Sequence, residues 1–130
     1  MTEKWSVYYD PKEKVIVADL TGLALSEPIL RKMAAEVVQL AKSLSEKVFM
    51  ISCWKVVKID DNFGKYFPEL TAELLRYTRG IVRYEATEVL TRANIRTQTV
   101  KHHHQNTQSH IYATREEALA AIRKLEKEQL

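Results

Sequence analysis

The chain has 130 residues, of which 45% are hydrophobic and 28% charged; this is enough for one hydrophobic core, so we expect a single domain, residues 1–130. The formal net charge of +3 is too small to require binding to nucleic acid or to a membrane surface. No apolar run approaches the roughly 20 residues of a transmembrane helix, and the polar residues 1–4 do not resemble a signal peptide, so we expect a cytoplasmic protein without membrane association.

The first part of the chain is expected to form a β-hairpin followed by a helix. Residues 5–9 and 15–20 are β-prone runs, and the charged residues 10–14 between them have the composition of a turn. Ser26, with an acid after it and a proline two residues later, is typical of a helix start. Apolar residues then recur at helical spacing as far as Leu44, which predicts a helix with one apolar face.

The most apolar stretch is residues 48–54, and it continues as a β-rich run to residue 59. Because polar and apolar residues do not alternate in it, we expect a strand covered on both faces, in the middle of a sheet. Cys53 lies inside this stretch and is the only cysteine, so it cannot form an internal disulfide. We interpret it as a small buried packing residue rather than a reactive thiol.

A second helix is expected to begin at the polar residues 60–62, any of which can cap it. Pro68 allows two interpretations: a kink in one long helix, which we favour, or the first turn of a shorter helix that begins near Phe67. Gly80 has the position of a glycine that ends a helix. The apolar face of this helix is formed by Phe63, Tyr66, Phe67, Leu70, Leu74 and Tyr77.

Residues 81–86 are expected to form the next strand. Arg83 and Glu85 share one of its faces, so we expect that face to be partly exposed, as near a sheet edge. Thr87 can then cap a third helix.

The last elements are a short strand at residues 110–113 and a helix opened by a capping box, in which Thr114 and Glu117 satisfy each other's backbone donors. The predicted order is therefore β-β-α-β-α-β-α-β-α. Such alternation predicts an α/β fold with a mixed sheet.

With these elements in this order, the chain resembles the STAS superfamily (sulfate transporter and anti-sigma-factor antagonist domains), especially its small stand-alone SpoIIAA-like or STAS/SEC14-like bacterial members. The resemblance covers nearly the whole length and rests on the hairpin, the helix start at Ser26, the central strand, Phe67-Pro68 and the terminal strand with Ile111-Tyr112. It implies a SpoIIAA-like fold with a mixed sheet of about five strands, an N-terminal β-hairpin and about four helices. It also implies a non-catalytic regulatory or protein-interaction module.

In the anti-sigma-factor antagonists of this superfamily, a serine or threonine at the start of the helix after the central strand is phosphorylated by a partner kinase. The corresponding residues 58–64 contain no hydroxyl side chain, so we expect a module without this phosphorylation switch. Two interpretations of its acids stay open: helix capping, and mimicry of the phosphorylated state. The expected partner is a protein, with a homodimer as one option. The expected partner-binding residues are Lys55, Lys58, Asp60, Asp61 and Asn62.

An alternative function is the binding of a small apolar or anionic ligand. The aromatic face of the second helix could line a pocket, and Pro68 would allow that helix to bend. The candidate pocket residues are Phe63, Tyr66, Phe67 and Leu70.

Other kinds of chemistry are not favoured. The chain has no Gly-x-Ser-x-Gly motif, no phosphate-binding glycine loop and no dinucleotide-binding turn, so we expect neither an enzyme nor a cofactor. His102, His103 and His104 diverge if they lie on a helix, and no acid or cysteine lies between them and His110, so we expect no metal site. Six arginines and lysines gather in residues 76–104 without a nucleic-acid motif, and a nucleic-acid partner is not expected.

Overall fold

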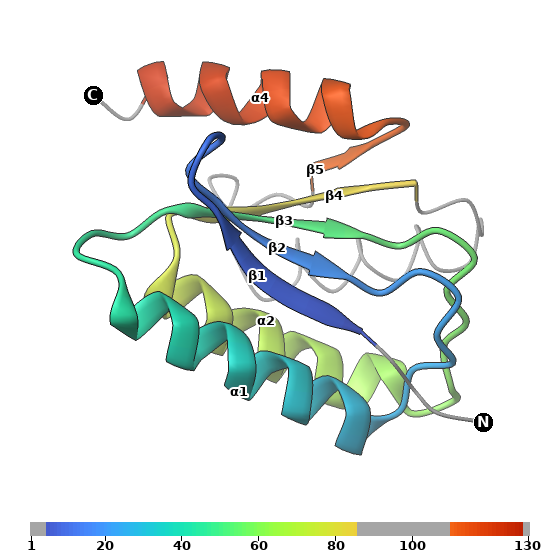
Figure 1. Ribbon diagram of the computed structural model, residues 1–130. Coiled ribbons are helices and arrows are strands. Elements are labelled where there is room, and N and C mark those ends of the chain that lie inside the picture. Colours follow the sequence, from blue (N-terminus) through green and yellow to red (C-terminus); the bar gives the residue numbers. More distant parts are fainter. Residues whose placement is uncertain (1–4, 86–109, 129–130) are drawn as a thin grey trace.

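A five-stranded mixed sheet forms the middle layer of the computed structural model, which describes residues 5–85 and 110–128 (Figure 1). The strands lie side by side in chain order, so the fourth element of the sequence, β3, takes the middle position. β1 pairs with β2 in the antiparallel direction, and every later pair is parallel. The predicted hairpin and the predicted central strand are therefore confirmed. The strands are β1 (Ser6–Asp10), β2 (Val15–Asp19), β3 (Phe49–Cys53), β4 (Gly80–Tyr84) and β5 (His110–Tyr112).

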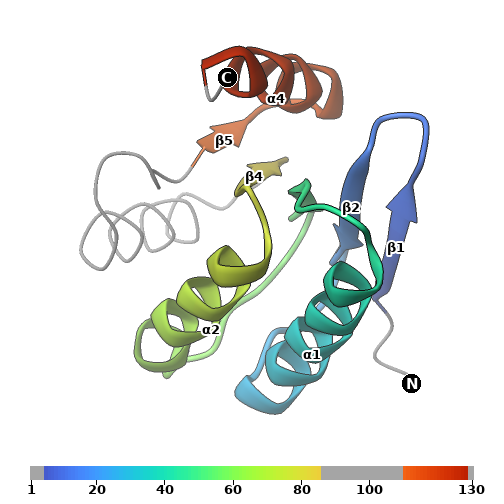
Figure 2. The same cartoon turned by 90° about the vertical axis from the view of Figure 1, so that its left-hand side faces the viewer.

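Helices cover both faces of this sheet. Helices α1 (Glu27–Ser43) and α2 (Phe63–Tyr77) lie on one face, and α4 (Arg115–Glu128) lies on the other, as two perpendicular views show (Figures 1 and 2). These are the three helices in the part of the chain that the structure describes. The predicted third helix, which would begin at Thr87, falls outside the described residues.

Two hydrophobic clusters, one on each face of the sheet, form the core. The larger lies between the sheet and α1 with α2, and its most buried side chains include Ile16, Leu30 and Phe63. The smaller lies between the sheet and α4, where Ile51 and Ile122 are fully buried. Since every residue of β3 is buried, this strand contributes side chains to both clusters, as its unbroken apolar sequence predicts.

The predicted helix starts agree with the structure, but the side chain of Ser26 does not cap the first helix as expected. Ser26 is the N-cap residue of α1, but its hydroxyl makes no capping hydrogen bond. Its carbonyl instead accepts the first helical bond, from Leu30 N at 3.0 Å. At the start of α4, the backbone N–H of Glu117 donates to Thr114 Oγ1 at 3.2 Å. Helix α2 continues through Pro68, so the long helix is the correct one of the two alternatives.

Ion pairs connect the hairpin to the last helix. Arg115 on α4 donates to Asp10 at the end of β1, with 3.2 Å between the Arg115 Nη2 and Asp10 Oδ2 atoms. Arg123, two turns further along α4, forms an ion pair with Glu13 in the turn at 2.9 Å and also donates to the backbone carbonyl of Glu13. The tip of the hairpin is thus held against the face of α4, more than a hundred residues away in sequence.

Strand β3 is shorter than the β-rich run that contains it: it ends at Cys53, because the chain turns at residues 54–57. The expectation of a partly exposed face on the next strand is wrong. Strand β4 has no exposed face over residues 81–84, and Arg83 is only 3% exposed. The alternation of residue types in β4 identifies which residues share a face. It does not indicate whether that face is exposed, and helix α2 covers the face that holds Arg83.

Gly80 has a different role from the predicted one. Helix α2 ends at Tyr77, and Gly80 begins strand β4. A Cβ atom at position 80 would lie 2.9 Å from Cε1 of the Phe49 ring on the neighbouring strand. Two features therefore favour glycine here: the close approach of the aromatic ring, and the backbone φ angle of 156°.

Replacing Gly80 with alanine is expected to lower the free energy of unfolding by about 2 kcal/mol, because the new methyl group must displace the Phe49 ring. Urea denaturation of the purified protein measures the loss. In a chain that also carries Phe49→Leu, the ring atom nearest the methyl group is gone, so the added cost of Gly80→Ala should shrink to the part that comes from the backbone φ angle of 156°, which residues with a Cβ atom rarely adopt. An unchanged cost in that background would show that the ring contact is not the cause.

Candidate functional site

The loop that follows β3, residues 55–62, lies at the carboxyl ends of the parallel strands, where α/β proteins commonly place their binding sites. Backbone hydrogen bonds fix it to the segment that follows β2. Gly22 N donates to Lys55 O at 2.8 Å, Lys58 N donates to Leu23 O at 2.9 Å, and Leu25 N donates to Lys58 O at 2.8 Å. These bonds hold two loops from different parts of the sequence together as one rigid edge.

Val56 is the most unusual residue of this loop. Its backbone φ angle is 56°, in the left-handed region that β-branched residues rarely adopt, and its side chain is 57% exposed. The flanking residues explain the geometry: Trp54 and Val57 are both buried, and Val57 N donates to Trp54 O at 3.2 Å across the turn. Val56 therefore presents an apolar side chain to solvent on a strained backbone, which costs about 1–3 kcal/mol.

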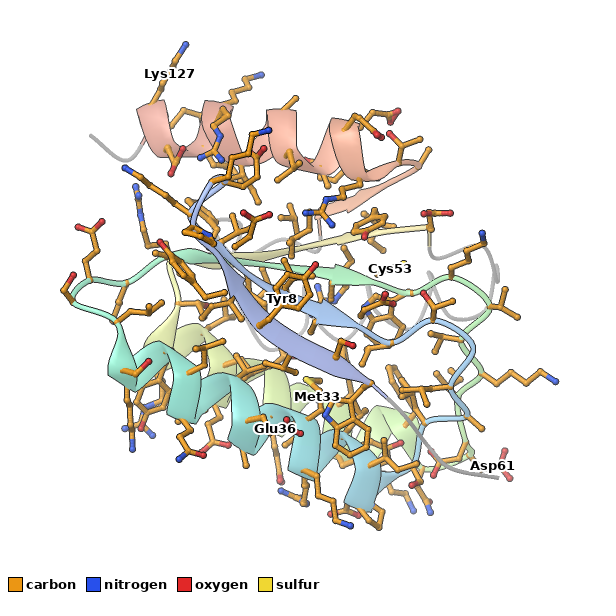
Figure 3. All side chains as sticks on the ribbon, in the orientation of Figure 1. Tyr8, Met33, Glu36, Cys53, Asp61 and Lys127 are labelled. Atoms are coloured by element: carbon orange, nitrogen blue, oxygen red, sulfur yellow. The ribbon has the colours of Figure 1, made fainter. Side chains whose placement is uncertain are left out.

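The predicted partner-binding residues divide into four exposed side chains and one that supports the fold. Lys55, Lys58, Asp61 and Asn62 are exposed, and Figure 3 shows Asp61 at the periphery of the molecule. Asp60 is half-buried and accepts a hydrogen bond from the Tyr66 hydroxyl at 2.9 Å. Burial and this hydrogen bond raise the pKa of Tyr66 above its ordinary value.

Helix capping by these side chains is limited. Asn62 is the N-cap residue of α2, but its side chain makes no capping hydrogen bond. The first turn is instead satisfied by backbone carbonyls: Phe63 N donates to Asp60 O at 3.2 Å, and Lys65 N donates to Asn62 O at 2.8 Å. The exposed carboxylate of Asp61 has no hydrogen bond or ion pair with the described residues.

The aromatic residues predicted to line a pocket pack mainly against one another. Phe63 and Phe67 are stacked with 4.4 Å between ring centroids, and Trp54 meets both rings edge to face at 6.1 and 5.8 Å. Phe63 also meets the ring of Tyr66 at 6.0 Å. These rings fill the space between the end of β3 and the start of α2, and the group includes Trp54, which was not among the predicted pocket residues.

A small cavity of about 20 Å³ remains between the sheet and helices α1 and α2. Phe67 and Leu70 of the predicted pocket border it, whereas Phe63 and Tyr66 do not belong to its lining. Most of the lining is apolar. The polar side chains at the cavity are Ser52, Thr71 and Arg83, and all three are buried.

Arg83 is the residue at this cavity that the sequence did not single out. Charged side chains are almost never fully buried without a partner, yet the Arg83 side chain takes part in no hydrogen bond or ion pair with the residues the structure describes. Its Nε atom is buried and unsatisfied, and its guanidinium lies 5.3 Å from the centroid of the Phe67 ring. Burial lowers the pKa of Arg83 to about 10, so the side chain is still charged at neutral pH. Its burial could have been inferred from the sequence by one feature: Arg83 shares a strand face with the apolar residue Ile81.

Within residues 5–85 and 110–128, no three histidine, cysteine or acidic side chains are placed to hold a metal ion. His102, His103 and His104 lie outside the described residues, and so does the side chain of His110. No helix in the described part of the chain is long and apolar enough to span a membrane.

Comparison with known proteins identifies the fold. No protein-family model matches the sequence, and no curated protein matches it either. A solved structure that does match is an anti-sigma-factor antagonist (STAS) domain protein from Planctomyces limnophilus, with a TM-score of 0.67 and 14% sequence identity. The match covers 92% of this chain and 97% of that one.

The chain therefore has an α/β fold of the STAS type, and the expected fold resemblance is confirmed. The five-stranded mixed sheet with its N-terminal hairpin agrees with the expectation in full. Since the two sequences share few residues, the likeness extends to the fold and not to individual side chains.

Proposed function

We propose that the chain is a non-catalytic regulatory module that binds a protein partner through residues 55–62. The observation that carries this proposal is Val56, an exposed apolar side chain on a backbone that is strained and yet held in place by its buried neighbours. Strain of this kind persists where the surrounding structure enforces it, and it gathers at binding sites. Lys55, Lys58 and Asp61 surround the apolar residue with charges of both signs, which is the pattern of an apolar contact with a polar rim.

The similar fold of the Planctomyces limnophilus protein supports this proposal, because that protein is described as an anti-sigma-factor antagonist. The composition of the loop differs from that of an antagonist whose binding is controlled by phosphorylation. Residues 58–64 have no hydroxyl group that a kinase could modify. We therefore propose that binding at this loop is constitutive and is regulated by the amount of the partner rather than by phosphorylation of the loop.

The test is a substitution that improves the fold while removing the contact. Val56→Gly should relieve the backbone strain and raise the free energy of unfolding by about 1 kcal/mol. The same change removes the exposed apolar side chain, so the affinity for the partner should fall by about tenfold or more. Affinity capture from an extract of the source organism, quantified by mass spectrometry, identifies the partner, and titration with the purified partner measures the change.

Lys124→Glu is the matched control, because Lys124 is exposed on α4 on the opposite face of the sheet. This variant should bind the partner as the unmodified chain does. If Val56→Gly gains stability and still binds the partner with full affinity, Val56 does not contribute to binding. That result would contradict the proposed surface.

A further inference from the structure

We propose that the cavity beside Arg83 binds one small monovalent anion, of the size of a halide ion. This inference does not depend on the proposed partner surface, which lies in the loop after β3. It rests on the charge of Arg83, on the groups that border the cavity, and on the volume of the cavity.

The first argument is the unbalanced charge. The guanidinium of Arg83 is removed from solvent, and no carboxylate among the described residues forms an ion pair with it. A buried charge without a counter-charge is strongly unfavourable, and proteins almost always pair such groups. The contact with the Phe67 ring holds the guanidinium in position, but a ring face cannot accept hydrogen bonds from all five N–H groups. An anion in the cavity would supply both the negative charge and an acceptor.

The second argument is the chemistry of the lining. Ser52 Oγ accepts a hydrogen bond from Trp54 Nε1 at 3.0 Å, so its own hydroxyl proton remains to be donated. The hydroxyl of Thr71 is in no hydrogen bond with the residues the structure describes. Together with Arg83, these groups form a set of donors at one cavity, and no carboxylate or amide side chain lines it. Such a set favours an anion over a cation.

The third argument is size. A cavity of about 20 Å³ has room for one occupant that is not much larger than a water molecule. A halide ion meets this limit. Sulfate, a phosphate ester and a fatty acid do not, and the apolar side chains that form the rest of the lining would leave the additional charge of a divalent anion unbalanced.

The proposal is tested by thermal unfolding at constant ionic strength, with sodium chloride replaced stepwise by sodium gluconate, whose anion is too large for the cavity. Chloride that binds only the folded state should raise Tm by about 4 °C for each tenfold increase in concentration above the dissociation constant. In Arg83→Met, a substitution of similar length without the charge, Tm should be the same in both salts. Arg31→Met, which removes an exposed arginine from α1, should keep the response to chloride.

A crystal grown or soaked in sodium bromide provides a second measurement that does not require the variant to fold. Anomalous scattering should place a bromide ion beside the Arg83 guanidinium, within hydrogen-bond distance of the Ser52 or Thr71 hydroxyl. Equal Tm values in chloride and gluconate for the unmodified chain would overturn the proposal. So would a response to chloride that persists in Arg83→Met, or a bromide-free cavity that contains only water.

Discussion

Replacing Phe63 with alanine is expected to lower the free energy of unfolding by about 4 kcal/mol, the largest single effect among our predictions. Phe63 is 1% exposed and is in ring contact with Trp54, Tyr66 and Phe67. Removal of its ring leaves a cavity that these neighbours cannot fill, because each is held by its own packing or hydrogen bond. Urea denaturation, followed by the fluorescence of the tryptophans, measures the loss.

Phe63→Leu is the companion to this variant. It keeps most of the apolar volume and loses only the aromatic contacts, so we expect a loss of about 1.5 kcal/mol. The difference between the two variants isolates the cost of the empty space. A loss below 1 kcal/mol for the alanine variant would mean that the first turn of α2 is not packed against Trp54.

Replacing Ile122 with alanine is expected to cost about 3 kcal/mol and to weaken the attachment of α4. Ala118 and Ile122 are the two fully buried side chains of this helix, and Ile122 is by far the larger. The rest of the attachment consists of the partly buried Leu119 and Leu125 and of partly exposed ion pairs, and each ion pair contributes little. Denaturation measures the total loss. Hydrogen exchange should show faster exchange of α4 amides than of β3 amides, because the helix can open locally.

Leu119→Ala is the matched control for Ile122→Ala, since Leu119 is on the same helix but only half-buried. We expect it to cost less than half as much. Equal losses for the two variants would show that α4 is held by a broad apolar surface rather than by one residue.

The parts of the fold that were predictable are those in which local pattern and tertiary environment agree. The unbroken apolar run around Ile51 predicts a strand with two covered faces, and the structure places it at the centre of the sheet. Ser26 and Thr114 mark helix starts that the structure confirms. In each case the local sequence reflects a need of the backbone or of burial, and no distant segment imposes a different structure.

The errors arise where a distant segment decides the local structure. Val56 and Val57 have a strong preference for strands, but the backbone bonds to residues 22–25 and the burial of Trp54 turn the chain before them. The exposure of β4 was mispredicted because a charged residue normally indicates solvent, whereas helix α2 covers Arg83. The burial of a strand residue depends on which element packs against its face of the sheet, and the residue type alone does not reveal this.

The candidate site shows the same limit. Its place after the central strand and the exposure of Asp61 and its charged neighbours follow from the sequence. The hydrogen bond between Asp60 and Tyr66 does not, because the two residues are six apart across an irregular turn and a helix start. The cavity at Arg83 needs three separate elements to form, since β3, β4 and α2 each contribute one of its polar side chains.

The ion pairs between the hairpin turn and α4 also determine the order in which the molecule can assemble. Asp10 and Glu13 leave the ribosome before their partners Arg115 and Arg123, which follow 105 and 110 positions later. The parallel pairing of β2, β3 and β4 already requires contacts over long stretches of chain, which slows folding. Until α4 emerges, the apolar face formed by Val17, Ile51 and Val82 lacks the helix that packs against it in the folded protein. A nascent chain is therefore most exposed to chaperones and to aggregation during synthesis of the segment between β4 and α4.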